Sequence, residues 1–239
     1  MVPLSFAGEE MALTRAGALF WPRMDTLFVA DLHLEKASFF ARTGQFLPPY
    51  DSRETLSRVT AEIAATGARR VITLGDNFHD PDGATRLEDG ACAMLEELTG
   101  RVEWIWITGN HDVGKDGFVA EARCGGALAA EMELGGVALR HEAHAGAAGP
   151  ELSGHFHPKL QMRVHGRRIN RPCAVIGRGA DGADRMVLPA FGTFTGGMSA
   201  ADPAVLRALR PAHRIEAVVP ARDRAVTIPL WQAGDSRAA

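Results

Sequence analysis

Side chains that can bind metal ions are concentrated in five short stretches of this sequence. The stretches read DLH at 31–33, GDNFH at 75–79, GNHD at 109–112, a single histidine at 141 and GHFH at 154–157, and together they hold six of the nine histidines. Imidazole, carboxylate and amide groups suit Mn, Fe, Zn or Ni, whereas calcium prefers oxygen ligands alone. The sequence therefore predicts a transition-metal site built from these stretches.

The candidate ligands are too many for one ion and suffice for two ions that share a carboxylate. They are Asp31, His33, Asp76, Asn110, His141, His155 and His157. Asp76 is central in this order and is the natural bridge. Two divalent ions roughly 3.5–4 Å apart can hold a hydroxide between them and clamp the attacking and leaving oxygens of a displacement at phosphorus. The two ligand carboxylates would not neutralise the four positive charges of two divalent ions. The site would therefore favour an anionic substrate such as a phosphate ester.

Three buried strands are expected to position the first three stretches. Apolar runs at 26–30, 71–74 and 104–108 each end at one of them, and the segments between, 51–67 and 86–100, carry apolar residues at helical spacing. This β-α-β-α-β pattern is typical of a parallel sheet buried on both faces. The carboxyl ends of its strands would share the edge at which open α/β sheets bind ligands.

Shorter strands follow from residue 126 onward, and they indicate a second sheet packed on the first with helices outside. We expect these strands at 132–134, 137–141, 151–156, 161–166, 173–177, 185–191, 214–219 and 225–230. The resulting fold class is α/β, with α+β character in layers. We expect one domain over 1–230 and a flexible tail over 231–239.

Local spacing predicts how the ligands face the site. Asp31 and His33 are two residues apart and can point to one side of an extended segment, as can His155 and His157. Gly75, Gly109 and Gly154 each precede a candidate ligand. Glycine allows the backbone to turn sharply and to approach a bound group closely.

Composition favours a cytoplasmic globular protein without a membrane span. Of the 239 residues, 46% are apolar and 23% are charged, and no window approaches about 18 uncharged apolar residues. The N-terminal residues carry acids where a signal peptide would be basic. Cys92, Cys124 and Cys173 match no zinc spacing and are expected to be reduced thiols.

Charge is distributed unevenly along the chain, whose net charge is -3. Residues 1–150 hold 13 Lys and Arg against 22 Asp and Glu, a balance of -9, whereas residues 151–239 hold 13 against 7, a balance of +6. Arginine binds phosphate bidentately, so the basic part could bind substrate, or it could form a solvated sheet face. The arginines concerned are Arg163, Arg167, Arg168, Arg171, Arg178 and Arg185.

The ordered set DxH, GDxxH, GNHD, a lone histidine and GHxH resembles the calcineurin-like metallophosphoesterase superfamily. The resemblance implies a four-layer α-β-β-α double β-sandwich. It also implies that Asp76 is shared by two metal sites, that His111 lies beside the phosphate as acid or transition-state stabiliser, and that Asp112 orients its neighbours without binding metal. By the same resemblance, the first site comprises Asp31, His33, Asp76 and His157, and the second comprises Asp76, Asn110, His141 and His155.

One position departs from many phosphatases of the superfamily. His79 stands where those enzymes have an aspartate that pairs with the GNH histidine, and the pattern GD-x-F-H is similar to the superfamily's double-strand-break-repair nucleases. Two alternatives stay open at this point. Either Asp80 replaces the missing carboxylate, or His79 itself contacts substrate.

Stretches beyond the metal motifs resemble the ligase-associated DNA-damage-response phosphoesterases of the PdeM type. These stretches are VADLHLEKASFFARTGQFLP, LSGHFHP and RPCAVIG...RMVLPAFGTFTGG. The resemblance implies an endonuclease or phosphodiesterase in bacterial DNA repair, with manganese as working metal and an ATP-dependent DNA ligase as functional associate. Because the acidic first half opposes nonspecific DNA binding, we expect a partner such as the ligase or a helicase to deliver the substrate. The competing hypotheses are a small-molecule phosphatase, a cyclic-nucleotide phosphodiesterase and, more remotely, a non-catalytic interaction module. The oligomeric state is left open.

Overall fold

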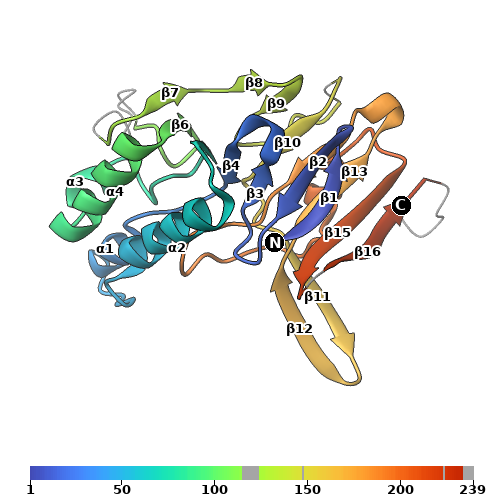
Figure 1. Cartoon of the computed structure of the whole chain (residues 1–239). Coiled ribbons are helices and arrows are strands. Elements are labelled where there is room, and N and C mark those ends of the chain that lie inside the picture. Colours follow the sequence, from blue (N-terminus) through green and yellow to red (C-terminus); the bar gives the residue numbers. More distant parts are fainter. Residues whose placement is uncertain (115–123, 147, 223, 234–239) are drawn as a thin grey trace.

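Two seven-stranded sheets form the centre of the protein in a computed structural model (Figure 1). The structure describes residues 1–114, 124–146, 148–222 and 224–233. The first sheet has the order β1 (Val2–Phe6), β2 (Glu9–Leu13), β3 (Leu19–Trp21), β4 (Thr26–Val29), β5 (Arg70–Leu74), β6 (Glu103–Ile107) and β7 (Ala127–Ala129). The second has the order β16 (Arg224–Gln232), β15 (Arg214–Ala221), β13 (Ala174–Arg178), β14 (Arg185–Val187), β10 (Glu151–Ser153), β9 (Val137–Leu139) and β8 (Met132–Leu134).

The helices lie outside the two sheets. They are α1 (Lys36–Ala41), α2 (Asp51–Thr66), α3 (Gly83–Arg86), α4 (Asp89–Arg101) and α5 (Pro203–Ala208), with 3-10 turns at Pro22–Met24 and Ala180–Gly182. Apolar side chains from α2 and α4 pack with those of β4 to β6 on one outer face, and α5 packs on the second sheet. A third apolar cluster lies between the sheets and joins them. The predicted layered double sandwich is confirmed. None of the described helices is long and apolar enough to cross a membrane.

The parallel part of the first sheet matches its prediction. β4, β5 and β6 pair in parallel, and the strands of this part bury nearly every residue because α2 and α4 cover one face and the second sheet covers the other. Their carboxyl ends therefore meet at one edge, as expected. The predicted helix at 86–100 corresponds to α4, which starts at Asp89, whereas Arg86 ends the separate short helix α3.

Other boundaries differ from the predictions. β1, β2 and β3 precede the parallel strands and were not predicted. β14 ends at Val187 rather than at residue 191. The predicted tail starts too early, because β16 continues to Gln232 and Trp231 pairs with Ile215 while its ring lies 4.6 Å from the Arg210 guanidinium carbon. Residues 234–239 lie outside the described residues.

A separate two-stranded ribbon leaves the second sheet between β10 and β13. It consists of β11 (Lys159–Val164) and β12 (Arg167–Pro172), which pair antiparallel over six residues each. Figure 1 shows the ribbon projecting away from both sheets. Only the first strand of this ribbon was predicted from the sequence, at 161–166.

Candidate metal centre

The five stretches converge where the two sheets meet at their strand ends. The loops after β4, β5 and β6 come from the first sheet, whereas His141 follows β9 and GHFH follows β10 of the second. Backbone hydrogen bonds join the loops: Asp31 N–H donates to the Gly75 carbonyl, and Gly154 N–H donates to the His141 carbonyl. His155 N–H donates to the Asp31 carboxylate at 3.0 Å and ties one sheet's loop to the other's.

The predicted ligands form two groups that share Asp76. Asp31, His33, Asp76 and His157 lie together, with ligand atoms within 4.8 Å of one another, and Asp76, His141 and His155 form a second such group. In the first group, His157 Nε2 is 3.2 Å from both His33 Nε2 and Asp31 Oδ1. The structure thus brings together the residues that the resemblance assigns to each of two metal sites.

The environment of His141 fits a cation. Its Nδ1–H donates to the Leu74 carbonyl at 3.0 Å, so Nε2 of the neutral ring carries a lone pair. That nitrogen is 3.3 Å from Asp76 Oδ1, 3.0 Å from Asn110 Oδ1 and 3.0 Å from His155 Nδ1. A lone pair that faces the oxygens of Asp76 and Asn110 is repulsive, and a divalent ion between them would satisfy these atoms. Because Asn110 Oδ1 lies beside the same nitrogen, Asn110 belongs with the second group of candidate ligands.

Burial keeps His33 and His155 in the neutral form that binds metal. Desolvation lowers the pKa of His33 to about 2, and His157 and Lys36 act in the same direction. Desolvation also lowers the pKa of His155. Metal ions bind the unprotonated nitrogen of a neutral imidazole, and the lowered pKa values leave His33 and His155 with one such nitrogen each at neutral pH.

Most of the candidate ligands hold an unfavourable backbone conformation. Asp31, His33, Asp76, His155 and His157 all have positive φ, between 43° and 72°. Such φ values cost about 1–3 kcal/mol each for residues other than glycine and concentrate at functional sites. The extended geometry predicted for the DLH and GHFH stretches is therefore wrong, although both side chains of each stretch still reach the same centre.

Glycine is required at 75 because of close packing against the site. Gly75 has φ of +80°, and a Cβ there would collide with the His141 ring. We expect Gly75→Ala to displace that ring and to lower turnover and metal affinity about 10–100-fold, the usual range when a ligand loses its orientation. Gly67→Ala is the control, because Gly67 has φ of +71° with nothing within 4 Å of its would-be Cβ. Equal turnover and metal affinity in the two variants would contradict this role.

His111 lies beside the two groups and is held by backbone. Its Nδ1–H donates to the His79 carbonyl at 3.0 Å, and its Nε2 faces Asp76 Oδ2 at 3.9 Å. The side chain is 43% exposed, so Nε2 is accessible from solvent. Asp80 does not pair with His111, because both of its oxygens accept from Arg86 at 2.9 Å. Of the two alternatives left open, the replacement by Asp80 is therefore wrong.

His79 packs against His111 and against two phenylalanines that the sequence reasoning missed. The rings of His79 and His111 stack with centroids 5.6 Å apart, and Phe39 and Phe40 of α1 contact His79 from the other side. Burial lowers the pKa of His79 to about 4, with Lys36 and His111 contributing in the same direction. The sequence signal available for this packing was the pair of phenylalanines at 39 and 40, a few residues after the DLH stretch.

Asp112 links the loops instead of facing the centre. Its buried carboxylate accepts from Gly109 N–H at 2.7 Å, from Phe78 N–H at 3.0 Å and from Asn77 Nδ2 at 3.0 Å. This placement fits the predicted orienting role.

We expect Asp112→Ala to lower the free energy of unfolding by about 3 kcal/mol or more, because several buried donors lose their acceptor. Chemical denaturation of the metal-free protein measures this loss, with the exposed Asp89→Ala as control. A change no larger than that of the control would contradict the linking role.

Two of the six arginines singled out by charge are structural. Arg178 pairs with Asp184 at 2.7 Å, and Arg185, only 1% exposed, pairs with Glu151 at 2.7 Å. Their charges are already balanced within the protein, so these two arginines do not form the free cationic surface that phosphate binding would need. The other four lie on the β11–β12 ribbon: Arg163, Arg167, Arg168 and Arg171.

The double sandwich and its paired site define a metal-dependent phosphoesterase. The profile of calcineurin-like phosphoesterases matches residues 24–148, which include the first four metal stretches. The chain belongs to this family. No functionally curated protein matches the sequence significantly.

The solved structures that are similar to this chain include a nuclease and a phosphoesterase. The nuclease MPE of Pseudomonas putida is 28% identical, with a TM-score of 0.66 over 90% of this chain and 95% of its own. The phosphoesterase YfcE of E. coli is 15% identical, with a TM-score of 0.44 over 86% of this chain and 99% of its own.

Proposed function

We propose that this phosphoesterase is a two-metal phosphodiesterase that cleaves DNA in repair. The observation that carries the proposal is the position of Asp76, whose carboxylate belongs to both ligand groups. A carboxylate that belongs to both groups can hold two metal ions at the short separation of a binuclear centre. The similarity to a nuclease over nearly the whole of both chains supports DNA as substrate, as does the GD-x-F-H pattern.

Each part of the site has a role in hydrolysis. Two bound divalent ions would supply an activated water and stabilise charge on the phosphoryl oxygens. The seven ligand residues hold and orient these ions. His111, with its Nδ1–H fixed on the His79 carbonyl, presents Nε2 toward the centre and can hold a proton there for the leaving oxygen. Lys36 adds a positive charge close enough to lower the pKa of His33 and His79.

The centre is open enough for a large substrate. Asp31, His33 and Asp76 are buried, whereas His111, His155 and His157 are partly exposed and Asn110 is exposed. The site therefore has a buried floor and a solvent-facing rim. A phosphodiester within a long chain can approach such a rim. A small substrate would not be enclosed there, as it is in the pockets that bind small molecules.

The proposal is tested with three substrates in parallel. Metal-free protein is reconstituted with Mn²⁺ and given bis-p-nitrophenyl phosphate, p-nitrophenyl phosphate and supercoiled plasmid. We expect cleavage of the diester and the plasmid. Turnover of the monoester alone, with the plasmid intact, would replace the proposal with a small-molecule phosphatase, and no turnover of any substrate would point to a non-catalytic interaction module.

The metal and the associates are further parts of the proposal. Manganese is proposed as working metal, and the same assay with Fe, Zn or Ni tests it, because the mixed nitrogen and oxygen ligands suit all four. An ATP-dependent DNA ligase and a helicase are proposed as functional associates, and the cytoplasm is proposed as the location of the protein. A pull-down from native cells that recovers neither associate would count against the partner proposal.

A further inference from the structure

The β11–β12 ribbon carries positive charges that have no acidic partners among the described residues. Between residues 159 and 172 it holds one lysine, four arginines and no acid. Its arginines all have exposed side chains. Among the described residues, no carboxylate lies within salt-bridge distance of any of these arginines, in contrast to Arg178 and Arg185 on the neighbouring sheet.

The register of the ribbon places like charges opposite each other. Arg163 pairs directly with Arg168, and Gln161 pairs with Asn170. Side chains of directly paired residues lie on the same face, so this face of the ribbon, which also holds Lys159, is polar and cationic along its length. The other face holds Leu160, Met162 and Val164 together with Arg167 and Arg171. Like charges directly opposite destabilise a strand pair. An anionic ligand would remove that cost.

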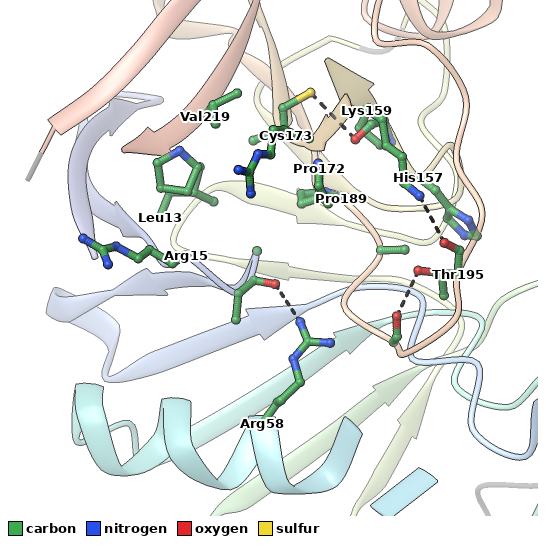
Figure 2. A pocket seen from close by; sticks show the side chains of 18 of the residues that line it. Leu13, Arg15, Arg58, His157, Lys159, Pro172, Cys173, Pro189, Thr195 and Val219 are labelled. Atoms are coloured by element: carbon green, nitrogen blue, oxygen red, sulfur yellow. Dashed lines mark hydrogen bonds between the residues drawn. The ribbon is translucent and has the colours of Figure 1, made fainter. Parts of the chain in front are cut away.

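The base of the ribbon leads into a cavity next to the metal centre. The cavity measures about 360 Å³ and is lined by Lys159 and Arg171 of the ribbon, by Arg58 of α2 and by the candidate metal ligand His157 (Figure 2). None of its lining residues in the described part of the chain is acidic. Lys159 Nζ donates to the Thr195 carbonyl at 3.1 Å and Arg58 to the Ala16 carbonyl at 3.1 Å, and neither carbonyl neutralises a charge.

We propose that the cationic face of the ribbon and this cavity form one tract that binds the phosphate backbone of the DNA flanking the cleaved bond. The inference rests on the proposed function and extends it from the metal centre to a specific binding surface. Guanidinium groups bond phosphate oxygens bidentately. The chain has a net charge of -3, but the basic side chains of the ribbon and the cavity are concentrated in the tract, so the local potential there is positive.

The dimensions of the ribbon suit a DNA chain. Six residues per strand extend for about 20 Å, the axial length of about six nucleotides of a B-form strand. A two-stranded ribbon also fits the major groove of a duplex. Single strands and duplexes offer the same backbone phosphates, so the test includes both.

The test measures binding separately from catalysis. Metal-free protein is titrated with a fluorescent 30-nucleotide single strand and with the matching duplex over a range of salt concentrations. For Arg163→Ala/Arg168→Ala we expect the slope of log K against log salt to fall by about 1.4 on single strands or 1.8 on duplex, as for two lost phosphate contacts. At 0.1 M salt this corresponds to a dissociation constant about 25–60 times higher.

A matched double variant controls for the loss of net charge. Arg69→Ala/Arg101→Ala removes two exposed arginines near the amino ends of β5 and β6, at the opposite edge from the metal centre. We expect this control to bind DNA as wild type does. Equal affinity and equal salt slope in both double variants would overturn the proposal, whereas a loss on either DNA form, confined to the ribbon variant, supports it and identifies the form bound.

A small diester separates this proposal from the proposed function. Bis-p-nitrophenyl phosphate needs the metal centre and does not reach the ribbon, so the ribbon variant should hydrolyse it at the wild-type rate within about twofold and should melt at the wild-type temperature or slightly above it. If wild type failed to hydrolyse the diester, the proposed function would fail while DNA binding could still be measured. If the ribbon variant lost diester turnover, the separate role of the ribbon would be wrong.

Discussion

Asp76→Asn should abolish hydrolysis while the protein stays folded. The substitution removes the one negative charge that belongs to both ligand groups. We expect the rate on bis-p-nitrophenyl phosphate to fall by about 10³-fold or more, because a binuclear centre contributes several kcal/mol to transition-state stabilisation and about 1.4 kcal/mol corresponds to tenfold in rate. Wild-type-like turnover would overturn the bridging role of Asp76.

The fold should tolerate this change because asparagine fits the local backbone. Asp76 has φ of 48°, a conformation in which asparagine is enriched. Asp76 Oδ1 accepts from His111 N–H at 3.0 Å, and the amide oxygen of an asparagine at this position can accept the same hydrogen bond. Thermal melting of the metal-free variant checks the fold, and metal content of the reconstituted variant checks binding. Asp89→Asn, in an exposed helical turn, is the matched control and should leave both turnover and metal content unchanged.

His111→Ala should separate catalysis from metal binding. His111 lies outside both ligand groups, and its ring reaches the centre only through Nε2 at 3.9 Å from Asp76. We expect both metals to remain bound and the rate to fall by about 10²–10⁴-fold, the usual contribution of a general acid. The measurement is metal content by elemental analysis together with the rate on the diester.

Two comparisons sharpen the test of His111. His213→Ala removes an exposed histidine that directly precedes β15 and should change neither rate nor metal content. His79→Ala removes the ring stacked on His111 but keeps the backbone carbonyl that holds Nδ1, so its effect should be smaller than that of His111→Ala. Loss of metal in His111→Ala would show that His111 is a ligand.

Local sequence predicted the first half of the site because parallel strands place their ends together. Buried apolar runs identified β4, β5 and β6, and the polar residues after each run had to share one edge of the sheet. That reasoning needed no knowledge of long-range contacts. The residue types at this edge, with their nitrogen and oxygen donors and no sulfur, also limited the range of metals.

The arrangement of the second half depends on long-range contacts. His155 and His157 reach the centre because His155 N–H bonds the Asp31 carboxylate and because Phe191 N–H bonds the Ala30 carbonyl. The two residues of the first bond are 124 positions apart. Nothing in the spacing GHFH indicated positive φ at both histidines, since packing from both sheets imposes that conformation against its local cost.

Charge was the property that the sequence described least well. Counting arginines showed a basic second part but could not separate Arg185, which is buried on Glu151, from Arg163, which is exposed on the ribbon. Composition and periodicity determine which elements form and which chemistry their ends offer, because both depend on near neighbours in the chain. Only the tertiary structure decides which charges are already paired, which imidazoles lose water and which strands project, because each of these depends on atoms that the sequence places far apart.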